Sequence, residues 1–155
     1  MTLLGYTDGA DASSGVSYLE LVDFITKHGA NPEEDLNQLW KRIVFSICVS
    51  NTDDHLRNHG FLLTAKGWIL SPAYDINPIE TGTGLKLNIS EEDNALDLDL
   101  ALEVAPYFRI TQNEGGDIIK QVLDVVSNWK KYANKYQISR LEQENKTDAF
   151  MVFGK

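Results

Sequence analysis

The segment from Asn31 to Val49 reads NPEEDLNQLWKRIVFSICV and carries the clearest structural signal in this chain of 155 residues. Asn31 is a favourable helix N-cap, Pro32 suits the first helical position, and Glu34 follows three residues after the cap. The apolar residues behind these signals recur at helical spacing and are Leu36, Leu39, Trp40, Ile43, Val44, Ile47 and Cys48. A stripe this wide predicts a central core helix that ends near Val49.

The run SNTDDHLRNHG occupies residues 50–60, directly after this helix. Its polar residues cannot continue the apolar stripe, so we expect a loop, and polar loops held by a buried helix often carry function. After the loop, residues 61–64 and 68–70 flank the sequence Ala65-Lys66-Gly67. This pattern predicts a β-hairpin with glycine in its turn.

The outer parts of the chain predict further helices around this centre. Two capping boxes of the form S/T-x-x-E, Ser17 with Glu20 and Thr111 with Glu114, mark helix starts. A short helix is expected after Ser17, with Gly29 past its end, and further helices are expected from Leu100 to Phe108, from Thr111 to Trp129 and from Ser139 to Phe150.

The remaining segments are less regular. Residues 1–15 are rich in Gly, Ser and Asp and indicate a loop, and residues 85–89 suggest a short strand. The sequence contains no repeat and no convincing domain linker, so we expect one domain over residues 1–155. Its predicted fold class is α+β and mainly α-helical, with helices around one small hairpin.

The composition is that of an ordinary globular protein, with 43% hydrophobic and 24% charged residues. No apolar stretch approaches the roughly 20 residues of a membrane span and no signal-peptide pattern opens the chain, so we expect a cytoplasmic protein. The formal net charge of −9 disfavours direct nucleic-acid binding, because contacts to phosphates need clustered Lys and Arg. The single cysteine, Cys48, predicts a buried, inert thiol.

Three side chains that carry oxygen stand at a spacing typical of protein kinases. Asp53 and Asn58 are five positions apart in the polar loop, and Asp75 follows beyond the hairpin. In kinases the first aspartate accepts or orients the proton of the acceptor hydroxyl, while the asparagine and the second aspartate bind Mg²⁺. Mg²⁺ is a hard cation that prefers carboxylate and amide oxygens, which explains these residue types.

The sequences SNTDDHLRNHGFLL at residues 50–63 and GWILSPAYDINP at residues 67–78 resemble the catalytic and metal-binding segments of HipA-family serine/threonine kinases, which are bacterial toxins. The opening MTLLG resembles the family's segment just after the interlobe hinge. The similarity is strongest from Trp40 to Pro78 and weakest beyond Ser90. It implies the C-terminal lobe of a protein-kinase-like fold, with the hairpin beside the catalytic loop.

The resemblance also implies a role for each site residue. Asp53 stands at the catalytic aspartate, Asn58 at the catalytic-loop asparagine, and Asp75 at the metal-binding aspartate, where it forms a Tyr-Asp pair with Tyr74. The implied cofactors are ATP and Mg²⁺, with Asn58 and Asp75 as the metal ligands. Asn58, Tyr74 and Asp75 are also expected among the residues that bind the nucleotide.

Other residues of the loop have two interpretations each. The resemblance implies that His55 contacts the ATP phosphates, and a hydrogen bond that holds the loop is the alternative. Arg57 suits a phosphate contact or an exposed contact that braces the loop. Asp54 is a rival base, but it is displaced by one from the family register, so we expect a loop-capping or solvated carboxylate. His28 and His59 are expected to be surface or structural residues.

The chain lacks a Gly-rich phosphate loop, a strand lysine and a hinge for adenine, all of which lie upstream in the family. We therefore expect a fragment or one half of a split kinase, inactive in isolation. The family further implies three partners. They are a protein substrate such as an aminoacyl-tRNA synthetase or another translation protein, a HipB-like DNA-binding antitoxin, and the missing N-lobe in cis or in trans.

Two other classes of function remain open from the sequence. The chain could be a non-catalytic interaction module that binds an antitoxin or a separate N-lobe. The pair Asp54-His55 with nearby carboxylates could indicate a metal-dependent hydrolase, although no H-x-x-x-H pattern supplies the expected nitrogen ligands.

Overall fold

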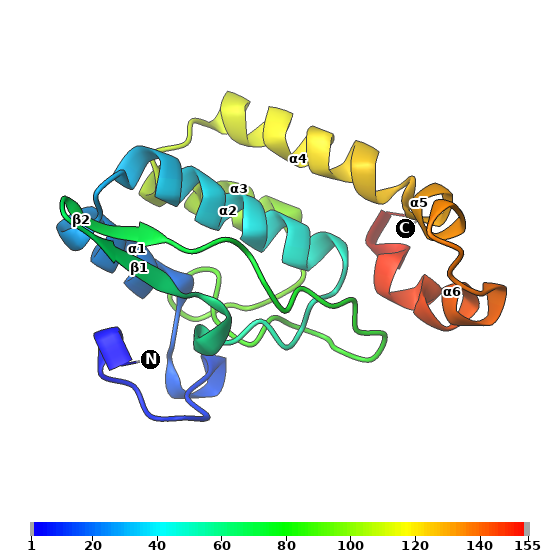
Figure 1. Ribbon diagram of the computed structural model, residues 1–155, viewed down its shortest axis with the longest axis horizontal. Helices are drawn as coiled ribbons and strands as arrows, with labels where there is room; N and C mark the ends of the chain where they lie inside the picture. Colours follow the sequence, from blue (N-terminus) through cyan, green and yellow to red (C-terminus); the bar gives the residue numbers. More distant parts are fainter. Residues whose placement is uncertain (1, 154–155) are drawn as a thin grey trace.

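Helix α2, from Pro32 to Cys48, forms the centre of the computed structural model, which describes residues 2–153 (Figure 1). Its predicted apolar stripe is confirmed, because every residue of that stripe is 0% exposed. Asn31 is the N-cap and Val49 the C-cap, as expected, although the Asn31 side chain makes no capping hydrogen bond. The sequence therefore predicted both the extent of this helix and the face that it buries.

Three helices pack around α2. They are α1 from Tyr18 to His28, α3 from Leu98 to Val104, and α4 from Gln112 to Val126. A short 3-10 helix, Ala105–Phe108, continues α3, so the predicted helix from Leu100 to Phe108 is confirmed with an earlier start. The fully buried Trp40 of α2 donates from Nε1 to the backbone oxygen of Ala101 at 2.9 Å.

Of the two predicted capping boxes, one is present in full and the other only in part. The Thr111 and Glu114 box at the start of α4 is complete. Ser17 caps α1 by accepting from the Leu19 amide, but Glu20 does not complete that box. Its carboxylate instead accepts a hydrogen bond from the hydroxyl of Tyr6, because the opening loop folds back against α1.

The predicted hairpin is present, with β1 from Phe61 to Thr64 antiparallel to β2 from Gly67 to Leu70. Gly67 pairs with Thr64 as the first residue of β2, so the turn consists of Ala65 and Lys66. A side chain at Gly67, whose φ is +131°, would place its Cβ 2.7 Å from the backbone oxygen of His28. Glycine thus lets the hairpin approach the end of α1.

The predicted strand at residues 85–89 is wrong. Leu85, Leu87 and Ile89 are buried, which explains the alternating pattern, but this segment forms only one isolated bridge, at Asn88. The bridge of Asn88 joins it to Ser17, which caps a helix and offers no neighbouring strand. The opening segment is mostly loop, with short 3-10 turns at Thr2–Leu4 and Ala12–Ser14, and Met1 lies outside the described residues.

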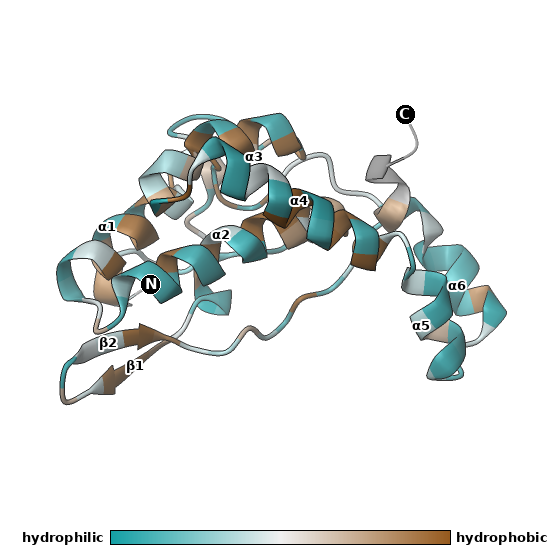
Figure 2. Cartoon of the chain, turned by 90° about the horizontal axis from the view of Figure 1, so that it is seen from above, coloured by the Kyte–Doolittle hydropathy of each residue, from teal (hydrophilic) through white to brown (hydrophobic). Residues whose placement is uncertain are grey.

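The C-terminal part differs from the prediction because the helix that begins after Thr111 ends at Val126. Trp129 starts a separate helix, α5, from Trp129 to Lys135. The expected final helix is divided into α6, from Arg140 to Lys146, and a 3-10 segment, Thr147–Phe153. Figure 2 shows α5 and α6 as mostly hydrophilic, with more hydrophobic turns in α2 and the hairpin strands.

Within residues 2–153 the structure contains six α-helices and a single two-stranded sheet, which agrees with a mainly helical α+β class. None of the described helices combines the length and the apolar character needed to cross a membrane. Cys48 is fully buried, as predicted, and this burial raises the pKa of its thiol to about 12.

Candidate functional site

The polar loop after α2 lies beside the segment that follows the hairpin. Backbone hydrogen bonds join the two at both ends, from the Ser71 amide to the Gly60 oxygen at 2.9 Å and from the Ile79 amide to the Ser50 oxygen at 3.2 Å. Arg42 of α2 also holds the segment, because its Nη2 donates to the Ser71 oxygen. The loop and the segment with Asp75 therefore form one surface.

Asn58 lies at the centre of this surface and is 5% exposed. Its Nδ2 is 3.5 Å from the backbone oxygen of Asp53 and 3.5 Å from that of Asp75. The structure thus brings Asp53, Asn58 and Asp75 together, while the side chains of the two aspartates remain exposed to solvent. Because the amide nitrogen faces the two carbonyls, Oδ1 of Asn58 is the atom directed away from them.

Asp75 has an unusual backbone conformation, with φ of 55°, which non-glycine residues rarely adopt. Its Oδ1 accepts a hydrogen bond from Nδ2 of Asn77 at 2.8 Å. Backbone conformations of this kind cluster at sites where the surrounding structure fixes a side chain for function. Here the fixing contacts come from Asn58 and from the neighbouring Tyr74.

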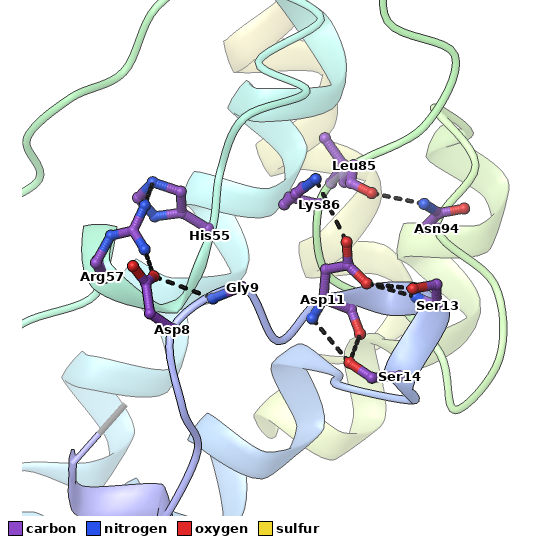
Figure 3. Close-up of polar contacts among 10 residues, drawn as sticks. All are labelled: Asp8, Gly9, Asp11, Ser13, Ser14, His55, Arg57, Leu85, Lys86 and Asn94. Carbon is purple, nitrogen blue, oxygen red and sulfur yellow. Dashed lines mark hydrogen bonds and ion pairs between the residues drawn. The ribbon is translucent and has the colours of Figure 1, made fainter.

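His55, Arg57 and Tyr74 form a connected group at the edge of the loop. The Tyr74 hydroxyl donates to the backbone oxygen of Arg57 at 2.6 Å, and Nη2 of Arg57 lies 2.9 Å from Nε2 of His55. Arg57 also forms an ion pair with Asp8 of the opening loop, as Figure 3 shows. The loop-bracing interpretation of Arg57 and His55 thus corresponds to contacts that are present.

Residues 1–129 match the model of a protein family described as "HipA-like C-terminal domain". The chain belongs to this family. A Haemophilus influenzae protein named "Putative kinase" is 31% identical over 96 residues. That match covers 56% of this chain and 28% of the other protein, so the HipA-like domain corresponds to only part of its relative.

Asp54 of this HipA-like domain differs from the expected loop-capping or solvated carboxylate, because it is only 4% exposed. Its Oδ2 accepts from the Tyr18 hydroxyl at 2.6 Å and from the Ser46 hydroxyl at 3.4 Å, and its Oδ1 lies 3.0 Å from Nε2 of His59. His59 is therefore a structural residue, as predicted, whereas the exposed His28 lies at the surface.

The electrostatics of Asp54 follow from these contacts. Burial raises the pKa of the Asp54 carboxyl, but His59 and the hydroxyl donors outweigh this effect and hold that pKa below its ordinary value of 3.8. Burial, the Asp54 charge and their hydrogen bond raise the pKa of Tyr18 well above 10.0. Asp54 is thus an ionised carboxylate beneath the loop, and Tyr18 is its neutral donor.

The sequence did not identify Tyr18 and Arg42 as parts of the site. Tyr18 lies within the apolar pattern of α1. The one signal available in the sequence was its hydroxyl, which needs a hydrogen-bond partner when the side chain is buried. Arg42 lies beside the apolar stripe of α2, and burial lowers the pKa of its guanidinium. A small cavity lined by Arg42, Asp54, Asn58 and Tyr74 connects these residues to the candidate site.

A more voluminous cavity lies elsewhere, between the end of α2 and helices α4 to α6, and has a volume of about 660 Å³. Its lining is mainly apolar and includes Phe45, Val126, Trp129, Tyr132 and Phe150. Trp129 stacks on Phe150 with ring centroids 4.3 Å apart. This cavity contains none of the three predicted site residues, so the chemistry of the domain is better assigned to the polar loop.

Proposed function

We propose that this HipA-like domain is the C-terminal catalytic lobe of a serine/threonine protein kinase that transfers the γ-phosphate of ATP to a protein hydroxyl. The observation that carries the proposal is the contact of Asn58 with the backbones of both Asp53 and Asp75. This arrangement corresponds to the catalytic and metal-binding elements of a kinase. Family membership and the name of the Haemophilus influenzae relative support the same class of reaction.

The residues present fit Mg²⁺ and ATP as cofactors. Oδ1 of Asn58 and the carboxylate of Asp75 are hard oxygen donors, which suit Mg²⁺. Among residues 2–153 no group of three or more His, Cys, Asp and Glu side chains gathers as a ligand set. A Mg²⁺ ion held by two protein side chains, by substrate phosphates and by water does not require such a group. When bound, Mg²⁺ supplies neutralisation of the charge on the phosphates.

Asp53 is the proposed catalytic residue. Its exposed carboxylate orients the Ser or Thr hydroxyl and accepts the hydroxyl proton. The hydroxyl oxygen then forms a bond to the γ-phosphorus, and the bond from that phosphorus to the bridging oxygen of ADP breaks. Asn58 and Asp75 hold the nucleotide in line for this transfer, so positioning and charge stabilisation provide most of the rate.

His55, Arg57 and Tyr74 are proposed to contribute to nucleotide binding. Arg57 presents guanidinium donors that suit phosphate oxygens. Nε2 of His55 accepts from Nη2 of Arg57, so a phosphate contact of His55 requires that hydrogen bond to be released. Tyr74 holds the Arg57 backbone in place through its hydroxyl. Because Asp8 pairs with Arg57, a phosphate contact requires Arg57 to exchange the Asp8 carboxylate for the ligand.

The wider biological role is proposed from the family. The domain would act within a cytoplasmic toxin of a bacterial toxin–antitoxin pair, with a HipB-like DNA-binding antitoxin and an N-lobe in cis or in trans as partners. The substrate class is a protein of the translation machinery, such as an aminoacyl-tRNA synthetase. The net charge of −9 supports partners other than nucleic acid for this chain.

Calorimetric titration with a non-hydrolysable ATP analogue, with and without Mg²⁺, tests the proposal directly. We expect binding that requires Mg²⁺, that is lost in Asp75→Ala and that is retained in Asp53→Ala, because Asp53 acts on the acceptor hydroxyl. Absence of binding by the wild-type chain would contradict a nucleotide half-site and favour a non-catalytic interaction module. Loss of binding in both variants would contradict the division of roles.

A further inference from the structure

We propose that Asp54 is a positioning residue that, with Tyr18, Ser46 and His59, holds the loop so that Asp53 and Asn58 face Asp75. This inference rests on the proposed function of those three neighbours. Asp54 itself touches neither nucleotide nor substrate in the proposal, because its carboxylate is buried beneath the loop. It acts indirectly, by holding Asp53 and Asn58 of the same loop in position.

The first argument is that the Asp54 carboxylate ties the loop to two helices. Tyr18 is the first residue of α1, and Ser46 lies in the last turn of α2. Their hydroxyls meet at Oδ2 of Asp54, at 2.6 and 3.4 Å. The loop therefore cannot shift relative to α1 and α2 without breaking a hydrogen bond to a buried charge, which is among the stronger polar interactions in proteins.

The second argument is the register of the contacts. Asp54 follows Asp53 directly, and His59 follows Asn58 directly. Asn58 contacts the Asp53 backbone across the turn, and His59 contacts Asp54 at 3.0 Å across the same turn. The second contact lies one residue further along the chain on both sides. The Asp53 oxygen that Asn58 approaches belongs to the peptide group of Asp54, so fixing Asp54 fixes that acceptor.

The third argument is the burial of the whole group. Tyr18 is 0% exposed, His59 is 6% exposed, and the two rings pack edge to face with centroids 5.6 Å apart. Asp35 of α2 offers a matched comparison, because its buried carboxylate accepts from the Leu70 amide at 3.1 Å. Within the part of the chain that the structure describes, the Asp35 side chain makes no hydrogen bond or ion pair with residues 50–60, so Asp35 holds the hairpin and has the structural role alone.

Hydrogen exchange and nucleotide titration of three variants test the proposal. Tyr18→Phe removes one hydrogen bond and keeps the ring, Asp54→Asn keeps the shape and removes the charge, and Asp35→Asn is the control. We expect the amides of Asn58 and His59 to exchange roughly tenfold to a hundredfold faster in the first two variants, as a lost charged hydrogen bond implies, while α2 stays protected.

The same two variants are expected to bind the Mg²⁺-dependent ATP analogue about tenfold more weakly, which corresponds to the loss of one hydrogen bond in the loop. Asp35→Asn should change neither the exchange of the loop nor the affinity. If Asp54→Asn does not fold, Tyr18→Phe decides the question alone. The titration measures the affinity for the analogue. A residue that only stabilised the fold would leave this affinity unchanged at temperatures where all the proteins are folded.

Two results would overturn the inference. The first is hydrogen exchange of the loop amides in Tyr18→Phe and Asp54→Asn at the wild-type rate. The second is faster exchange of these amides with unchanged affinity for the analogue. If the wild-type chain binds no nucleotide, the proposed function fails and Asp54 positions no such site, whereas the exchange data still show whether Asp54 holds the loop. The experiment therefore distinguishes a failure of the proposed function from a failure of Asp54 to hold the loop.

Discussion

Asn58 and Asp75 meet across 17 positions of sequence, with Nδ2 of Asn58 3.5 Å from the backbone oxygen of Asp75. The same nitrogen lies 3.5 Å from the backbone oxygen of Asp53. Because the nitrogen faces these carbonyls, Oδ1 is the atom left for Mg²⁺ in the proposed site. Asn58 therefore has two separable tasks, joining the two segments and providing a metal ligand.

Substitution of Asn58 separates these tasks. Asn58→Asp retains an oxygen ligand and loses the donor, whereas Asn58→Ala loses both. We expect Asn58→Asp to bind the Mg²⁺-dependent ATP analogue with affinity reduced by about tenfold, the effect of one hydrogen bond, and Asn58→Ala to show no such binding. Calorimetric titration measures both. Wild-type affinity in Asn58→Ala would exclude Asn58 as a ligand.

The ion pair between Asp8 and Arg57 is expected to compete with a phosphate ligand. Both side chains are largely exposed, at 73% and 49%, so Asp8→Ala should change the free energy of unfolding by less than about 1 kcal/mol. The same variant should bind the ATP analogue more tightly, because Arg57 no longer has to release a carboxylate. The gain should shrink as salt rises.

Asp23→Ala provides the matched control for Asp8→Ala. Asp23 forms an exposed pair with Lys27 on α1, at 2.7 Å, and is not part of the proposed site. This variant removes the same charge and should leave the affinity for the analogue near that of wild type. An equal gain in both variants would indicate a general effect of net charge rather than release of Arg57.

The buried Asp54 predicts a loss of stability in acid. Its pKa is lowered in the folded state, so its ionised form stabilises the fold above its ordinary value of 3.8, and this contribution is lost as pH falls through the folded value. Urea unfolding at a series of pH values should therefore show a steeper acid decline in wild type than in Asp54→Asn. Parallel curves for the two proteins would contradict this assignment.

Cys48 is expected to resist thiol reagents while the chain is folded. Its side chain is 0% exposed, and burial raises its thiol pKa to about 12, so almost no thiolate exists near neutral pH. Labelling at pH 8 should be slow in buffer and complete after denaturation. Rapid labelling of the folded chain would show that the end of α2 opens readily.

The sequence predicted those parts of the fold that depend on local pattern. The stripe of α2 and the hairpin were predicted because apolar spacing and turn residues act over a few positions. The proximity of Asp53, Asn58 and Asp75 followed from a known spacing and a hairpin that returns the chain. The structure contains these features because no contact with a distant segment favours a different local conformation.

The errors arose where distant segments determine the outcome. Tyr18 and Asp54 are 36 positions apart, so their hydrogen bond left no local pattern, and Asp54 was expected to be a loop-capping or solvated carboxylate. Glu20 stood at the right position for a capping box, but the distant Tyr6 hydroxyl binds its carboxylate. Trp129 matched the periodicity of α4, yet its stacking on Phe150 accompanies a new helix.

Gly115 and Gly116 at the start of α4 have the same helix propensity and opposite surroundings. A Cβ at Gly115 would lie 2.6 Å from Cδ1 of Leu102 and 3.3 Å from Cη2 of Trp40, whereas a Cβ at Gly116 would meet nothing within 4 Å. Alanine in a helix is favoured over glycine by roughly 1 kcal/mol. Gly116→Ala should therefore raise the free energy of unfolding by about that amount.

Gly115→Ala should instead lower the stability, because crowding of a packed core typically costs about 1–3 kcal/mol and exceeds the gain in propensity. Trp40 is fully buried and cannot move away, so Leu102 must change its rotamer. A Leu102→Ala background removes the closest contact and leaves the 3.3 Å contact with Trp40, so Gly115→Ala should cost less stability there than in wild type. Urea unfolding of these variants measures the coupling between Gly115 and Leu102, and additive effects would show that α4 adjusts its position without resistance.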